Sequence, residues 1–193
     1  MEDFILYFKM GLYHVLDFSA YDHILFLIVL AVVFSFYQWK KVIGLVTLFT
    51  IGHSLTLGLS AYGVLKIKMD IIEFLIPLTI FLTGWMNILS TKKRGIGKEN
   101  TNLILALFFG LIHGLGFSNY FKMMIGKEEE KLFPLLEFAL GIEVSQISIV
   151  LAVLVLGSLL QSFFRVSKRD WVLVASSIVI GFSIQMMIDR VFW

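Results

Sequence analysis

The feature that most constrains this chain is its succession of long apolar segments. Six of them cover residues 21–38, 42–65, 71–90, 101–120, 133–164 and 171–188. A helix needs about 20 predominantly apolar residues to cross ~30 Å of hydrocarbon, and each segment approaches or exceeds that length. We therefore predict an all-α, polytopic integral membrane protein with six transmembrane helices. The connections are short, so we expect one transmembrane domain that covers residues 1–193.

Composition supports this class. Hydrophobic residues make up 59% of the chain and charged residues 16%, against about 25% charged residues in an ordinary soluble domain. Cysteine is absent, which excludes disulfides, thiolate metal ligands and cysteine nucleophiles. Before the first segment, residues 4–16 are apolar but interrupted by Lys9, Gly11 and His14. That run is too short to cross a bilayer, and we expect a short N-terminal interfacial helix.

The connecting stretches fall into two sets by charge. One set carries nine basic residues and two acids, namely Lys40, Lys41, Lys92, Lys93, Arg94, Lys98, Arg165, Lys168 and Arg169 against Glu99 and Asp170. In the other set, which includes both termini, acids balance or outnumber the bases. Lys and Arg accumulate in cytoplasmic loops. We therefore predict a multi-pass protein of the cell (inner) membrane with both termini outside the cytoplasm.

The strongest functional signal is the pair Asp22-His23 at the outer end of the first segment, with His14 just upstream. Ionisable residues at membrane depth are costly and generally functional. Imidazole nitrogen and carboxylate oxygen together suit Ni²⁺, Co²⁺, Zn²⁺ or Mn²⁺. The carboxylate could be a ligand itself, or it could orient an imidazole from outside the coordination shell. The alternative is that both residues lie among the lipid headgroups and only anchor the helix.

Two further histidines lie near the middle of their own segments. His53 stands between Thr50 and Ser54, and His113 stands between Gly110 and Gly114. Hydroxyls beside His53 could hold its tautomer, although a histidine satisfied within the core is the alternative. The glycines fit close helix packing, which does not account for the histidine.

The fifth segment adds two glutamates, Glu137 and Glu143, in its outer half. Glu143 and Gln146 share a helix face, and Glu143 is the deeper of two glutamates, so we name it as a candidate ligand or proton carrier. Supporting residues are predicted to be Ser54, Thr50, Glu73, Glu137 and Gln146. Glu73 and Glu137 could equally be interfacial.

The chain resembles the HupE/UreJ family. The similar stretches are His14 followed by Asp22-His23-Ile-Leu-Phe, then Phe49-Thr50-Ile-Gly-His53-Ser54, Phe109-Gly110-Leu-Ile-His113-Gly114 and Gly141-Ile-Glu143-Val-Ser-Gln146. Members are small membrane proteins associated with hydrogenase and urease and are regarded as nickel permeases. The resemblance implies metal-linked roles for His14, Asp22, His23, His53, His113 and Glu143.

The favoured interpretation is a secondary permease that takes up a divalent transition metal through a site open to the outside. Nickel is the first choice of ion, with zinc or cobalt as alternatives. The expected partners are the metal ion and the lipid bilayer, without nucleic acid, and a homo-oligomer is left open. A first alternative is a zinc-dependent intramembrane hydrolase with the same residues as catalytic metal ligands. A second is a b-type haem protein with paired axial histidines.

Overall fold

The computed structural model describes residues 2–17, 21–65, 67–91, 99–126 and 130–193. Its elements are α1 (Glu2–Leu16), α2 (Asp22–Ala31), the 3₁₀ turn η1 (Phe36–Gln38), α3 (Trp39–Ala61), α4 (Met69–Ser90), α5 (Glu99–Gly116), α6 (Ser118–Ile125), α7 (Leu132–Phe163) and α8 (Lys168–Asp189). The described residues contain no strand. The predicted all-α class is therefore confirmed for this part of the chain.

Four helices, α3, α4, α7 and α8, are long and apolar enough to cross a membrane. A fifth crossing is available if α5 and α6, which meet at a bend of 54°, are taken as one broken span. The expected continuous helix over residues 101–120 is thus wrong in detail, because it breaks at Phe117. The structure supports a multi-pass membrane protein with four or five spans by these criteria.

The first predicted span is also wrong in detail, because residues 21–38 do not form one helix. Helix α2 is only ten residues long and ends at Ala31. The backbone N–H of Ser35 donates to Oε1 of Gln38 over 3.0 Å, an arrangement typical of a capping box that starts a new helix. At the other side of the break, Nδ2 of Asn87 donates to the carbonyl oxygen of Val29 over 2.7 Å. These two bonds pair one backbone N–H and one backbone carbonyl at the break, where the helix does not continue.

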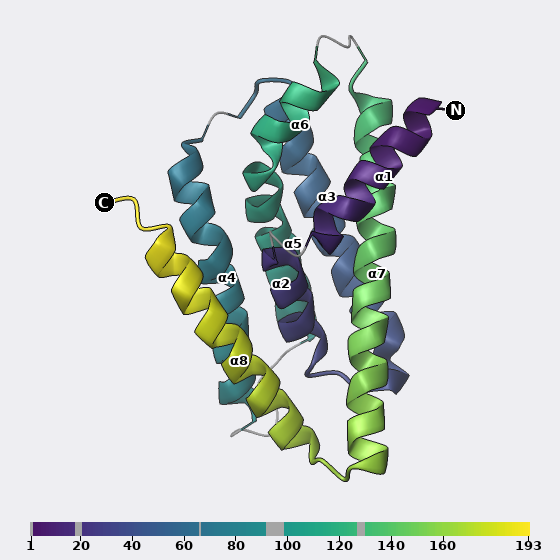
Figure 1. The fold of residues 1–193 in the computed structure, drawn as a ribbon, viewed down its shortest axis with the longest axis vertical. Coiled ribbons are helices and arrows are strands. Elements are labelled where there is room, and N and C mark those ends of the chain that lie inside the picture. The colour runs from purple at the N-terminus through teal and green to yellow at the C-terminus, as the bar shows by residue number, and fades with distance from the viewer. Residues whose placement is uncertain (1, 18–20, 66, 92–98, 127–129) are drawn as a thin grey trace.

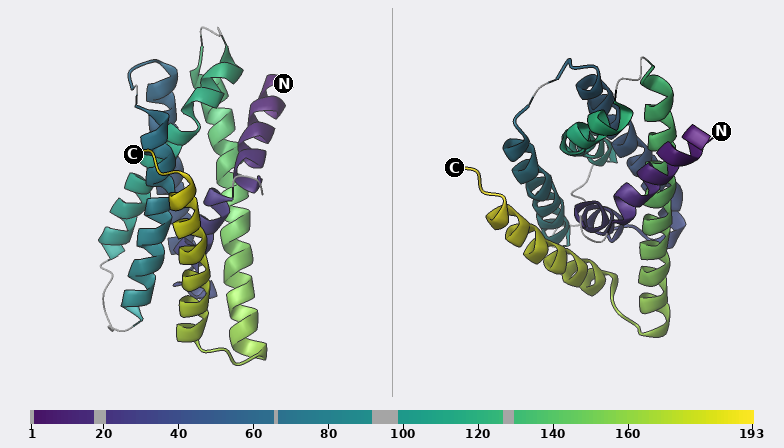
Figure 2. Two further views of the ribbon diagram at one scale, coloured as in Figure 1. Left: turned by 60° about the vertical axis from the view of Figure 1, so that its left-hand side comes forward. Right: turned by 45° about the horizontal axis from the view of Figure 1, so that its top comes forward.

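Figure 1 shows how these pieces are arranged, and "upper" and "lower" refer to that view. Helix α1 accompanies the upper part of α7, and α2 lies lower, in the centre of the bundle. Helices α3 and α5 form a tightly packed pair, and α4 pairs with α8. Figure 2 shows that α4 and α8 form one side of the bundle and that α7 stands on another. Helix α2 contacts α4, α7 and α8, so the short helix is enclosed by long ones.

The α3–α5 pair is held at backbone contact by glycines. A Cβ atom added at Gly110 would overlap the carbonyl oxygen of Phe49, and one at Gly114 would overlap that of His53. Only glycine permits such close helix approach. The consequence is that His53 of α3 and His113 of α5 face the same interior region.

Helix α1 crosses α7 in the same way. A Cβ atom at Gly11 would overlap the carbonyl oxygen of Phe138, and one at Gly141 would overlap that of Phe8. This crossing brings the last turn of α1, which carries His14, into the bundle. Helix α1 covers this N-terminal stretch, and its contact with α7 sets its position. That it is interfacial stays a prediction.

Candidate metal centre

Three histidines from three helices meet in the interior of the bundle. His14 comes from the last turn of α1, His23 from the start of α2 and His53 from the middle of α3. Each offers a ring nitrogen, and these atoms all lie within 4.8 Å of one another. The centroid of the His113 ring, from α5, lies 5.5 Å from that of His23. The chain therefore brings its four predicted histidines into one region, which we call the histidine cluster.

Five imidazole nitrogens of this cluster are buried and unpaired among the described residues. Nε2 of His14, His23 and His113, and both ring nitrogens of His53, have no hydrogen-bond partner among the residues that the structure describes. His53 is fully buried and His113 is 1% exposed. Buried polar atoms without partners cost free energy, and native proteins rarely leave several together. Neutral imidazoles with free lone pairs fit a divalent transition metal.

Two of the rings are held in a fixed orientation. Nδ1 of His23 donates to Oδ1 of Asp22 over 3.0 Å, and Nδ1 of His113 donates to the carbonyl oxygen of Phe109 over 2.9 Å. Each bond places the proton on Nδ1, so the Nε2 lone pair is left free for a metal. The hydrogen bond from His23 to Asp22 fits the second of the two roles that the sequence left open for this carboxylate.

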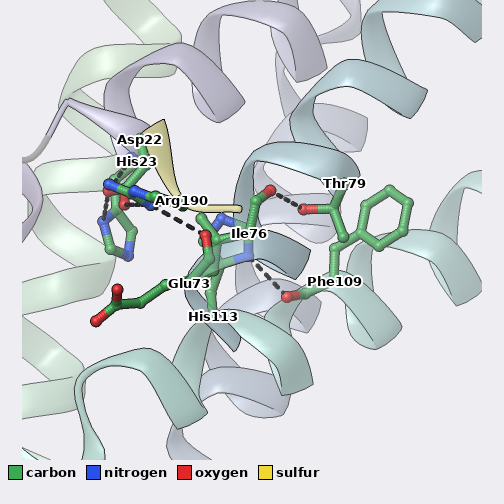
Figure 3. A network of polar contacts seen from close by, with 8 residues as sticks. All are labelled: Asp22, His23, Glu73, Ile76, Thr79, Phe109, His113 and Arg190. Atoms are coloured by element: carbon green, nitrogen blue, oxygen red, sulfur yellow. Dashed lines mark hydrogen bonds and ion pairs between the residues drawn. The ribbon is translucent and has the colours of Figure 1, made fainter. Parts of the chain in front are cut away.

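An arginine that the sequence pattern did not single out also reaches this site. Nη1 of Arg190 lies 3.8 Å from Oδ2 of Asp22 and donates to the carbonyl oxygen of Glu73 over 3.3 Å, as Figure 3 shows. Pro77 lies inside α4, four residues after Glu73. Because proline has no N–H, the Glu73 carbonyl lacks its helical donor and is available to the guanidinium.

A cavity of about 1090 Å³ occupies the upper part of the bundle. His14, His23 and His113 line it together with Asp22. Its lining also includes Glu73, Arg190, Lys9, Tyr13, Tyr120 and Phe117. Tyr13 is 64% exposed, so the cavity reaches the surface near the upper end. Three of the four clustered histidines can therefore be approached from that side.

His14 lies on α1, which is not among the candidate spans. Its ring centroid is 3.9 Å from that of Phe117 and 4.5 Å from that of His23. Burial of the ring, and then the proximity of His23, hold the pKa of His14 well below its ordinary value of 6.5. The imidazole is therefore neutral at neutral pH, which is the form that coordinates metal.

Glu143 does not join the histidine cluster. Its Oε1 accepts from the hydroxyl of Thr47 over 2.6 Å, and its Oε2 accepts from the hydroxyl of Thr50. The Thr50 hydroxyl also lies 2.9 Å from Oε1 of Gln146. These residues form a separate polar group between α3 and α7, one helical turn before His53. None of these residues belongs to the group of His14, His23 and His53, whose ring nitrogens lie within 4.8 Å of one another.

The remaining predicted residues are dispersed. Glu73 lines the upper cavity and is exposed, whereas Glu137 is half-buried on α7. Ser54 follows His53, and its buried hydroxyl has no partner among the described residues. Sequence reasoning missed Arg190 and Pro77. A proline four residues after Glu73 was a usable signal, because it predicts a freed carbonyl.

A comparison with protein families matches the chain to the model described as HupE / UreJ protein over residues 1–190. No curated protein and no solved structure gives a significant match. The family match covers nearly the whole chain and confirms the resemblance seen in the four sequence motifs.

Proposed function

We propose, on the premise that this chain belongs to the HupE / UreJ family, that it is a secondary permease that takes up a divalent transition metal ion. The ion binds the histidine cluster from the upper cavity. Nickel is the favoured cargo because the family is linked to nickel, and cobalt or zinc would suit the same nitrogen ligands. The whole chain acts as one transmembrane domain.

The observation that carries this proposal is the set of five unpaired, buried imidazole nitrogens on four histidines. A bare cluster of this kind is costly without a cation. The cluster is reached from one end of the bundle through a cavity lined by His14, His23 and His113. A cation that enters there exchanges water for imidazole nitrogen. Asp22 keeps Nε2 of His23 available throughout, and its charge favours a cation.

We further propose that the chain crosses the inner membrane six times, with both termini outside. The first crossing would run over residues 21–38, with α1 as the interfacial helix before it, and the bent pair of α5 and α6 would form another. His14 lies just before this first crossing and His23 at its outer end. The crossing is interrupted after α2, and interrupted helices commonly build the substrate site of transporters. At the lower end lie the basic residues Lys40, Lys41, Arg165, Lys168 and Arg169, as expected for a cytoplasmic face. Lys92, Lys93, Arg94 and Lys98 lie outside the described residues.

The experiment is metal uptake by purified protein in proteoliposomes. Wild type should accumulate Ni²⁺ and bind it in equilibrium titration, whereas His23→Ala should lose both high-affinity binding and uptake. Gly44→Ala, at a site with no atom within 4 Å of the added methyl group, is the control for handling. Wild-type protein that binds no metal, or a His23→Ala variant that binds and transports normally, would refute the proposal.

One observation favours a second candidate, an intramembrane zinc hydrolase with the same ligands. The upper cavity of about 1090 Å³ is far larger than a metal ion requires, and it slightly exceeds the roughly 300–1,000 Å³ of organic-ligand sites. Three imidazoles and an open position would suit a catalytic zinc. Wild-type protein that binds zinc tightly, never moves metal, and cleaves lipid or amide substrates would establish this candidate instead.

A further inference from the structure

A second cavity, of about 400 Å³, lies in the lower part of the bundle. It is bordered by α2, by the start of α3 and α5 and by the end of α4. Its polar lining residues are Gln38, Thr83, Asn87, Ser90, Asn102 and Lys168. This lower cavity shares no lining residue with the upper cavity. The two therefore approach the centre of the bundle from opposite ends.

A layer of aromatic rings separates the two cavities. The ring of Phe26 stacks on that of Phe49 at a centroid distance of 4.7 Å. The centroid of the Phe109 ring lies 6.2 Å from that of Phe26. On the upper side, the His113 ring lies 5.3 Å from that of Phe26. Phe26 and Phe109 line the lower cavity and His113 lines the upper one. Phe26 and Phe49 are fully buried, so a single layer of rings divides the two spaces.

We propose that Phe26, Phe49 and Phe109 form the closed inner gate of the protein and that the lower cavity is the vestibule into which the cation is released. This inference rests on the proposed permease function. Apolar constrictions exclude water and ions when closed. The Phe26 ring lies against that of His113, so a displacement of Phe26 would open the gate next to the histidine cluster.

The chemistry of the two cavities gives the passage a direction. The upper cavity presents imidazole nitrogens and the Asp22 carboxylate, which bind transition metals well. The polar lining of the lower cavity consists of neutral hydroxyl and amide groups and the ammonium of Lys168. Among these described lining residues there is no carboxylate or imidazole. A cation that passes Phe26 meets weaker ligands than imidazole and carboxylate, which favours release.

The position of Phe26 suits a moving part. It lies on α2, which spans only Asp22–Ala31, and it shares this helix with His23. A shift of α2 would therefore move a metal ligand and the gate together, without displacing a full-length helix. Asn87, which bonds the Val29 carbonyl over 2.7 Å, ties the lower end of α2 to α4.

The natural absence of cysteine allows a direct test by thiol accessibility. Thr83→Cys places a thiol in the lower cavity and Tyr13→Cys places one in the upper cavity. Right-side-out and inside-out vesicles are treated with a membrane-impermeant maleimide in the absence of metal. The closed gate predicts that Tyr13→Cys reacts only from the outside and Thr83→Cys only from the inside. Adding Phe26→Ala should abolish the protection of Thr83→Cys from the outside.

Phe121→Ala is the matched control, because Phe121 is also a fully buried phenylalanine but lies on α6 in the upper half, with its ring against Phe138. It should leave both labelling patterns unchanged. If Phe26→Ala does not accumulate in the membrane, Phe26→Leu, which also shortens the side chain, takes its place. The gate is refuted if Thr83→Cys reacts from the outside in otherwise unchanged protein, or if neither Phe26 variant alters its labelling.

The labelling result is independent of metal transport. If Phe26 protects Thr83→Cys from the external reagent but the wild-type protein transports no metal, the barrier is supported and the permease is refuted. Normal nickel uptake, combined with Thr83→Cys labelling that is the same with and without the Phe26 substitution, would support the permease and refute this gate.

Discussion

Nη1 of Arg190 lies 3.8 Å from the carboxylate of Asp22, the residue that orients His23. The guanidinium is anchored there by the Glu73 carbonyl that Pro77 leaves without a helical donor. A positive charge thus stands beside a site proposed for a cation. It balances the charge of Asp22 when no metal is bound, and it repels a metal cation that binds at the site.

Arg190→Gln should strengthen nickel binding, because it removes this opposing charge while keeping a hydrogen-bond donor. The gain should be roughly 0.2–1 kcal/mol, the range measured for exposed ion pairs. Isothermal titration with Ni²⁺ measures it, and Arg190→Lys, which keeps the charge, is the control. Binding weakened by Arg190→Gln would instead make Arg190 a positioning residue for Asp22.

Asp22→Asn should weaken nickel binding about 10- to 100-fold, the usual effect of losing an outer partner of a metal-bound histidine. The shape is kept, so the loss reflects the charge and the tautomer of His23. Titration at fixed ionic strength checks it, with Asp70→Asn, an acidic residue in the first turn of α4, as a control for net charge. Unchanged affinity would remove Asp22 from the site.

Gly110→Ala should destabilise the protein by about 1–3 kcal/mol, because overpacking at a backbone contact forces helices apart. The clash is with the carbonyl of Phe49, so α3 and α5 would separate and nickel binding should weaken as well. Thermal unfolding in detergent measures the change. Gly44→Ala in α3, with open space around the new methyl group, should be neutral or stabilising. Equal behaviour of the two variants would contradict this packing.

Nickel affinity should persist to lower pH than an ordinary histidine would allow. Burial lowers the pKa of His14 below 6.5, so protons compete with metal for this ligand only below that value. The unfolded chain still takes up its proton near pH ~6.5, so the stability contributed by neutral His14 is present above that pH and is lost as the pH falls below it. Titrations at about pH 7.5 and 6.5 should therefore give the same nickel affinity. A steep loss of affinity between these two values would contradict it.

The proposed orientation is testable with two cysteines in exposed connections. Tyr37, between α2 and α3, is 94% exposed, and Val64, between α3 and α4, is 68% exposed. An impermeant thiol reagent should label Val64→Cys but not Tyr37→Cys in right-side-out vesicles. The opposite pattern would place the upper cavity in the cytoplasm and reverse the direction of transport.

The apolar segments predicted most of the helices. Hydropathy gave no sign, however, that the helix over residues 21–38 is interrupted. The break there is made by polar hydrogen bonds of Ser35, Gln38 and Asn87. The Ser35-x-x-Gln38 spacing is itself a capping-box pattern and could have located it. Asn87 belongs to another helix, so its contribution depends on tertiary packing.

The four histidines could be selected from the sequence because each is unusual in its apolar context. Their convergence is created by contacts at long range, such as the crossing of α1 and α7 at Gly11 and Gly141. This crossing explains why His14, expected at the interface, lies 5.8 Å by ring centroid from His53. Glu143 was selected for the same reason, and the hydroxyls of Thr47 and Thr50 take up its carboxylate instead.

The central claim is that the histidine cluster holds the transported cation, and X-ray absorption at the nickel edge tests it most directly. The spectrum of the nickel-loaded protein should show at least three imidazole nitrogens at ~2.0–2.1 Å, the usual distance of a first-row divalent metal from histidine. His23→Ala and His53→Ala should each reduce the imidazole contribution. A first shell made only of oxygen, unchanged in both variants, would contradict the account.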